Sequence, residues 1–214
     1  MTEAATSTPL FLYSTTGAHS HNLNSVGTTV IEDNATTTAL PSPPAQRTPD
    51  TWTAPVAHSY KLNFAGATFA EDDTAGIGVV ICNEAGLIMA SLSQRIPLPT
   101  SVIEVEALAA RRAMEFALEL GFDNVTLEGD SEVLVKTLKN GGNTLVHYGN
   151  MIAGILFLTS HFSKVQFSFV RRQCSRLAHS LARRASIIQQ MSICMGEVPL
   201  ELMPVFLANL HSLP

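Results

Sequence analysis

The sequence lacks the features of a secreted, a zinc-binding or a membrane protein. Its 214 residues include three cysteines, Cys82, Cys174 and Cys194, which have neither CxxC nor Cys/His spacing. A scattered, odd set of this kind argues against a disulfide framework and against a zinc site. No stretch approaches the roughly 18 apolar residues that cross a bilayer. We therefore expect an intracellular protein, in the cytoplasm or the nucleus, with no membrane partner.

We also expect no targeting signal, and the sequence has no surplus of positive charge. The apolar stretch 10–13 is too short for a secretory signal, and the first basic residue, Arg47, comes late for a transit peptide. Charged residues make up 14% of the chain, and the net charge is −5. Proteins that bind nucleic acid non-specifically rely on Lys and Arg to neutralise phosphates. The total charge therefore argues against tight non-specific binding, but it leaves room for a local basic patch.

Composition divides the chain into three parts. Residues 1–50 are rich in Thr, Ser, Ala, Asn and Pro without a hydrophobic period, so we expect a disordered tail. Residues 51–190 carry the strand and helix patterns of one folded domain. Residues 191–214, with Pro199 and Pro204, indicate a C-terminal extension that packs on the domain.

The order of patterns in residues 51–190 predicts an α/β fold. Strands are expected over 60–67, 75–82, 87–94, 125–130 and 164–171, and helices over 101–120, 132–140, 149–162 and 175–190. This order predicts a mixed five-stranded sheet, in which a three-strand antiparallel meander is joined to a parallel βαβ half. Because such crossovers are right-handed and lie over the sheet, helices are expected on both faces.

Glu106 interrupts the apolar stripe of the first helix. The stripe consists of Val102, Ile103, Ala107, Ala109, Ala110, Ala113, Met114, Phe116, Ala117 and Leu120. The charges Glu104, Arg111, Arg112, Glu115 and Glu119 lie elsewhere around the helix, as expected of solvent-facing residues. An unpaired buried carboxylate is costly. Glu106 therefore lies at the edge of the stripe, pairs with a buried arginine, or serves a metal or acid/base site.

Asp130 and His179 each allow a structural and a functional interpretation. Asp130, followed by Ser131, is a good N-cap for the next helix, but it also ends a strand of an open α/β sheet, where sites collect. His179 begins an otherwise apolar helix face, and by pattern alone it is a helix residue bonded to a neighbouring loop. The isolated His58, His147 and His161 are expected at the surface or in packing roles.

Five motifs, in order and spacing, resemble the ribonuclease H type of domain, and most closely its plant, retrotransposon-derived, reverse transcriptase-like group. They are Trp52 with Pro55 and the strand 61–67 (KLNFAGA), then 75–80 (AGIGVV), 104–109 (EVEALA), 127–131 (LEGDS), and 170–172 with 178–182 (VRR and AHSLA). The resemblance covers about residues 52–190, and residues 197–207 look like the C-terminal extension of that group.

The resemblance implies a two-Mg²⁺ site that hydrolyses the RNA strand of RNA–DNA hybrids. Glu106 and Asp130 match two of its metal-binding carboxylates, and His179 stands at the last site position. Ala65 replaces the aspartate that normally bridges both metals, so the resemblance implies weakened Mg²⁺ binding, and we expect this position to lie in an open, wet cleft. Ser175 stands where the plant group typically has Asn.

Three functions remain open from the sequence. The protein is an active hybrid endoribonuclease, a catalytically dead module that binds nucleic acid or a protein, or a retroelement remnant. Nucleic-acid contacts are expected at Asn63, Arg171, Arg172 and Arg176. Together with Arg183 and Arg184, these arginines form a local cationic patch or a solvated helix face. The loss of the carboxylate at position 65 favours impaired catalysis.

Overall fold

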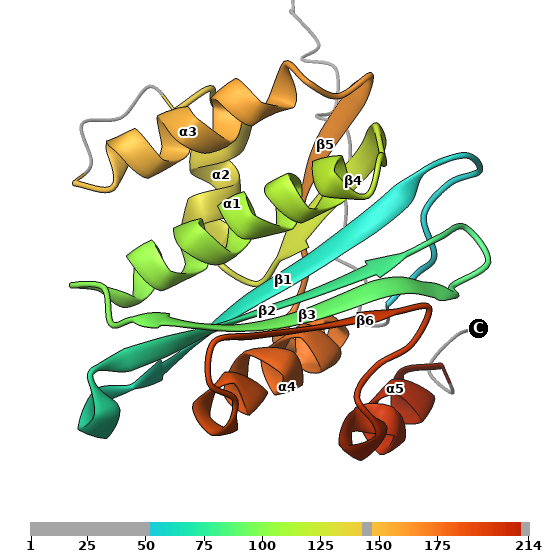
Figure 1. Cartoon of the computed structure of the whole chain (residues 1–214). Coiled ribbons are helices and arrows are strands. Elements are labelled where there is room, and N and C mark those ends of the chain that lie inside the picture. The colour runs from blue at the N-terminus through green and yellow to red at the C-terminus, as the bar shows by residue number, and fades with distance from the viewer. Residues whose placement is uncertain (1–51, 143–146, 211–214) are drawn as a thin grey trace, which may run out of the picture. The chain divides into compact units, whose positions relative to one another are not determined.

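The computed structural model describes residues 52–142 and 147–210 (Figure 1). The strands are β1 (Tyr60–Phe69), β2 (Thr74–Cys82), β3 (Ile88–Pro97), β4 (Asn124–Gly129), β5 (Lys164–Phe169) and β6 (Met191–Met195). The helices are α1 (Val102–Glu119), α2 (Glu132–Lys139), α3 (Gly149–Thr159), α4 (Arg176–Arg184) and α5 (Met203–Leu210). The tail expected over residues 1–50 lies outside the described ranges. Within them, no helix is both long enough and apolar enough to cross a membrane.

The strands form one mixed sheet in the order β5-β4-β1-β2-β3-β6. Antiparallel pairs join β1 to β2, β2 to β3 and β3 to β6. Parallel pairs join β1 to β4 and β4 to β5. The predicted meander and parallel half are therefore confirmed, but the predicted number of five strands is wrong. The sixth strand, β6, comes from the first residues of the segment that we expected to be an appendage.

Helices cover both faces of the sheet, as predicted (Figure 1). On one face, α1, α2 and α3 pack over the larger apolar cluster, which includes Leu62, Phe64 and Phe116. On the other face, α4 and residues of α5 pack over a smaller cluster built around Ala65 and Leu181. Successive residues of β1 alternate between these two clusters because the side-chain period of a strand is two.

Short-range signals fix the ends of α1. The helix begins with a capping box, in which Ser101 and Glu104 satisfy each other's backbone N–H groups, and Gly121 adopts a positive φ of 77° just beyond its end. Glu104 is therefore a cap residue, and our expectation of a solvent-facing charge at this position was wrong.

The last predicted helix is shorter than expected. It ends at Arg184 instead of Gln190, and the 3-10 turn η3 (Ala185–Ile187) follows it. The chain must leave the helix there to return to the sheet as β6, whose partner β3 lies about 100 positions earlier in the sequence. The sequence around β6 does not predict its pairing with a strand so far away along the chain.

Two glycines of β2 let α4 lie directly against the sheet. A Cβ atom on Gly76 would collide with the backbone of Ala182, and one on Gly78 would collide with the backbone of Ala178. Each glycine therefore supplies the close approach that any side chain would prevent. This contact holds the helix that carries His179 at a fixed height above β1 and β2.

Candidate functional site

Glu106 lies buried between α1 and β1. Its side chain reaches over Gly66, whose backbone N–H donates to Glu106 Oε1 over 3.3 Å. Its second carboxylate oxygen, Oε2, is buried and has no hydrogen-bond partner among the described residues. Glu106 is thus neither at the stripe's edge nor paired with a buried arginine. An orphaned, buried carboxylate oxygen indicates a functional site more than a structural role.

The environment of Glu106 makes its carboxyl group unusually basic. Burial raises its pKa from the ordinary 4.5 to about 7, and the nearby negative charge of Asp130 adds to this effect. The Gly66 N–H and the positive charge of Arg172 act in the opposite direction but do not compensate. A carboxyl group with this pKa exchanges protons near neutral pH.

Asp130 is free for function because its neighbour caps the helix. The N-cap of α2 is Ser131, whose hydroxyl accepts a hydrogen bond from Leu134 N over 3.4 Å. The Asp130 side chain lies instead against α4, with Oδ2 at 2.9 Å from His179 Nε2 and 3.7 Å from Arg172 Nη1. The structure therefore brings Asp130 and His179 together.

The two carboxylates differ in their pKa because their neighbours differ. Burial alone would raise the pKa of Asp130, but the hydrogen bond and charge of His179, followed by the charge of Arg172, lower it overall. Asp130 is therefore ionised at neutral pH, where Glu106 is partly protonated. His179 is itself buried, with 7% of its surface exposed, so its contact with Asp130 is shielded from solvent.

Three adjoining cavities surround these residues, and Arg172 lines all of them. Glu106 and Asp130 border one cavity together, as expected for residues of one site. A second cavity, of about 540 Å³, runs from β1 past Glu106 to His179 and Arg183. The third lies along α4 and is also lined by Val205 of α5. We call the second and third cavities, with Arg172, Arg176 and Arg183, the arginine groove.

The other arginines of the predicted patch have different roles. Arg171 is exposed next to the groove. Arg184 lies on another side of α4, where its Nε donates to Glu201 Oε1 over 2.6 Å. Arg184 thus ties α4 to the C-terminal segment, and our expectation that it belongs to the cationic patch was wrong.

Asn63 is buried within the domain instead of facing a nucleic acid. Only 3% of it is exposed, its Nδ2 donates to Glu128 Oε2 over 3.3 Å, and its Oδ1 accepts from Ser175 Oγ over 2.8 Å. Glu128 also pairs with Lys61 at 2.9 Å, with both side chains buried. This chain of polar contacts joins β1 and β4 to the residue before α4, so the prediction of a nucleic-acid contact at Asn63 was wrong.

Lys61 and Glu128 are structural residues that we did not predict from the sequence. Each interrupts an apolar strand, which is a visible signal of a buried charge, but only the parallel pairing of β1 with β4 shows that they are partners. Lys61 Nζ also lies 5.3 Å from the centre of the Trp52 ring and donates to Thr53 O. The start of the described chain is thereby attached to the sheet.

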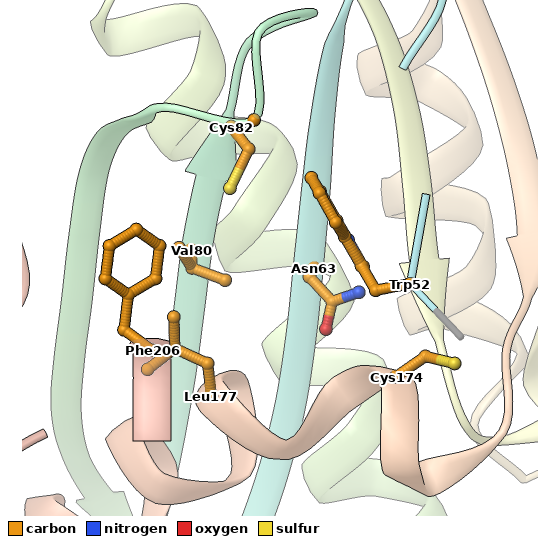
Figure 2. A pocket seen from close by; sticks show the side chains of 8 residues that line it. Trp52, Asn63, Val80, Cys82, Cys174, Leu177 and Phe206 are labelled. Atoms are coloured by element: carbon orange, nitrogen blue, oxygen red, sulfur yellow. The ribbon is translucent and has the colours of Figure 1, made fainter. Parts of the chain in front are cut away.

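A small pocket lies beside this polar chain. Figure 2 shows Trp52 and Asn63 on one side of it and Leu177 and Phe206 on the other, with Cys82 and Cys174 apart from each other. Both cysteines are buried. Burial raises the pKa of Cys82 to about 12, so its thiol is not a nucleophile at neutral pH.

The surface histidines were predicted correctly. His58, His147 and His161 are all exposed. His147 lies 3.9 Å from Glu104 Oε1, and His161 packs edge-to-face on Phe157. None of them borders the cavities around Glu106 and Asp130.

The environment of Ala65 contradicts one of our expectations. We expected an open, wet cleft at this position, but Ala65 has no exposed surface and belongs to the apolar cluster beneath α4. The described residues contain no group of three or more His, Cys, Asp or Glu side chains that could hold a metal ion. Two carboxylates are too few for a pair of Mg²⁺ ions, which take mainly oxygen ligands. The donor set therefore does not fit a two-metal site.

Comparisons with known proteins agree with this fold. Residues 63–185, more than half of the chain, match the reverse transcriptase-like family. No curated protein matches the sequence. RNase H1 from the halophilic archaeon Halobacterium salinarum is 25% identical, with a TM-score of 0.56, and the match covers 60% of this chain and 98% of that chain.

Two further solved structures resemble the chain at lower identity and bear on the fold alone. The N-terminal RNase H domain of a Mycobacterium tuberculosis protein is 20% identical, with a TM-score of 0.53 over 59% of this chain and 92% of that chain. LC11-RNase H1, whose structure holds an RNA/DNA hybrid, is 22% identical, with a TM-score of 0.52 over 59% and 95%. It was isolated from compost by a metagenomic approach. With its mixed sheet and helices on both faces, the chain belongs to the reverse transcriptase-like family and has a ribonuclease H-like fold.

Proposed function

We propose that this protein is a ribonuclease H-like domain that binds nucleic acid and cleaves RNA–DNA hybrids weakly or not at all. The observation that carries the proposal is Ala65. It stands where the family resemblance implies the bridging carboxylate, and it is buried among apolar side chains. No other described carboxylate joins Glu106 and Asp130 to complete a metal site.

The binding part of the proposal rests on the groove and on the relatives. Arg172, Arg176 and Arg183 are exposed and line adjoining cavities next to Asp130 and His179. LC11-RNase H1, which shares the fold, has been seen in complex with an RNA/DNA hybrid. Arginine suits phosphate recognition because its planar guanidinium group donates two parallel hydrogen bonds.

Weak metal binding follows from the ligands that remain. Glu106 and Asp130 would hold a Mg²⁺ ion, and the orphaned Oε2 of Glu106 is an available ligand atom. Asp130 Oδ2 is already engaged by His179, so a metal must compete for it. When bound, Mg²⁺ supplies positive charge at the phosphate and lowers the pKa of bound water. Two carboxylates alone cannot hold two Mg²⁺ ions in fixed positions.

The test is a cleavage assay on a labelled RNA–DNA hybrid, with Mg²⁺ and with Mn²⁺. We expect negligible turnover by the wild-type protein. Robust turnover that Glu106→Gln abolishes would contradict the proposal, because it would show that the remaining ligands suffice.

The Ala65→Asp variant tests the cause of the impairment. It should partly restore cleavage, because it returns the carboxylate that the family resemblance implies at this position. It should also lower Tm in the absence of metal, because position 65 is buried and a carboxylate there is costly. Ala65→Asn, which has the same shape without the charge, is the matched control and should not restore cleavage. A folded Ala65→Asp protein that stays inert would show that the first ligand is not the cause.

A second candidate function is that of a protein interaction module. It is favoured by Met191, Ile193 and Met195, which are 50%, 41% and 58% exposed along β6. Because β6 is an edge strand of the sheet, it offers both an apolar row and an open strand edge. Failure to bind any nucleic acid, together with specific self-association or partner binding through β6, would favour this function.

A further inference from the structure

We propose that the arginine groove holds a phosphodiester group of a nucleic-acid strand directly on the guanidinium groups of Arg172 and Arg183, with no divalent metal between them. The inference rests on the proposed binding function and deepens it. It names the groups that contact the nucleic acid and states that binding requires no metal.

The first support is the arrangement of the cations. Arg176 follows Arg172 by four positions and Arg183 follows Arg176 by seven, along η2 (Arg172–Ser175) and α4. All three therefore share one side, where they line the same cavity. All three are exposed. No carboxylate of the described residues pairs with the guanidinium of Arg176 or Arg183 within ion-pair distance. Arg172 contacts Asp130 at 3.7 Å with one nitrogen, and its side chain remains 67% exposed.

The second support is that side chains already contact the acidic residue beside the groove. In a metal-dependent site, the bound metal ions would offset the negative charge of both the carboxylates and the phosphate. Here His179 Nε2 lies 2.9 Å from Asp130 Oδ2, and Arg172 lies on the same oxygen. A phosphate can therefore approach Arg172 and Arg183 without a metal to screen Asp130.

The third support is the wall that faces the arginines. The end of β1 supplies Gly66, Ala67, Thr68 and Phe69, none of which is charged. Glu106 is the only acidic residue lining this cavity in the described part of the chain, and its Oε1 is turned to Gly66 N. Three guanidinium groups therefore line the groove beside two carboxylates, one of which is already paired.

Fluorescence anisotropy with a short labelled RNA–DNA hybrid, and with each of its single strands, tests the inference. Binding is measured with the full chain in Mg²⁺ and in EDTA, over a series of salt concentrations. We expect the same affinity in Mg²⁺ and in EDTA. Arg183→Ala should weaken binding about tenfold, and it should reduce the slope of log affinity against log salt by about 1, because one phosphate contact is lost.

Arg111→Ala is the matched control. Arg111 is also an exposed helical arginine, but it pairs with Glu115 on α1 and lies outside the groove. It should leave affinity and salt slope unchanged, and thermal unfolding should show that both variants are folded. Binding that requires Mg²⁺ would overturn the inference. So would metal-independent binding that the Arg172→Ala/Arg183→Ala double variant leaves intact, although the proposed function would then survive. No binding under any condition would overturn both.

Discussion

The carboxyl group of Glu106 lies where three conditions favour the protonated form. It is buried, it is near the negative charge of Asp130, and only one backbone N–H donates to it. In an unfolded chain none of these conditions applies, and the pKa returns to about 4.5. The difference in pKa makes the stability of the fold depend on pH.

We predict that the free energy of unfolding decreases as pH rises from about 4.5 to above 7. Below pH 4.5 Glu106 is protonated in both states, and above 7 folding must bury its charge. The loss is about 3 kcal/mol, because one pKa unit corresponds to about 1.4 kcal/mol. Glu106→Gln, which is neutral at every pH, should remove this dependence in Tm measured across the range.

The matched control for Glu106→Gln is Glu115→Gln on the same helix. Glu115 is partly exposed and pairs with Arg111, so the pH dependence should persist in that variant. Asp130 acts in a different window, since its pKa is lowered and its contribution disappears only at acidic pH. If the Tm of the wild type stays constant between pH 5 and 8, folding does not raise the pKa of Glu106 and the prediction is wrong.

At the scale of elements, the packing of α4 on β2 positions His179 and the arginines together. The helix lies close because Gly76 and Gly78 have no side chains and because α4 presents Ala178 and Ala182. The obstructing atoms are helix backbone, which cannot rotate away as a flexible side chain would.

Gly78→Ala should therefore destabilise the fold by about 3 kcal/mol, at the upper end for overpacking, because the added Cβ meets the backbone of α4 and lies 2.9 Å from Leu181 Cβ. Thermal or denaturant unfolding measures the change. Gly154→Ala, in the middle of α3, is the opposite control. Its nearest neighbour is Arg111 Nη1 at 3.8 Å, so it should stabilise α3 by about 0.5–1 kcal/mol. Equal effects of the two substitutions would contradict the close packing.

The elements that the sequence predicted best are those with complete local signals. Alternation marked β1, β2 and β3, and Ser101 with Gly121 marked both ends of α1. The sequence did not predict β6, because five residues with two methionines and a cysteine gain strand geometry only from β3. Neither did it predict α5, which packs on α4.

The candidate site was predictable in its charged residues and not in their surroundings. Glu106 was recognisable as a polar residue within an apolar stripe, and Asp130 by its place at a strand end. The burial of Asn63 and of Ala65 depends on α4 and on the C-terminal segment, which lie more than 100 positions away. Sequence periodicity describes only the element that carries a residue, so these two positions were misjudged.

At the scale of the whole domain, the C-terminal segment completes the sheet and the smaller cluster. β6 extends the sheet at β3, Val198 is 3% exposed within the cluster of Ala65, and Glu201 holds Arg184. The segment is therefore part of the domain's hydrophobic core as well as of its sheet.

Deletion of the chain after Gln190 should lower Tm markedly. Exposure of the surface that Val198 covers costs about 2 kcal/mol by itself, and the hydrogen bonds between β6 and β3 are lost as well. The deletion also opens the edge of β3, so we expect self-association in size-exclusion chromatography. Val198→Ala should lower Tm less and leave the protein monodisperse to the same degree as the wild type. An unchanged Tm after deletion would show that the segment contributes nothing to stability.

The neighbouring residues Ser131 and Asp130 have one further consequence. Ser131 begins α2 by itself, and Asp130 is left to the cavity. A change at Asp130 can therefore alter what the surface recognises while the helix beside it still forms. One residue starts the helix and its neighbour lines the site. A scaffold of this kind can therefore lose one activity and acquire another through substitutions at the site, while every intermediate sequence still folds.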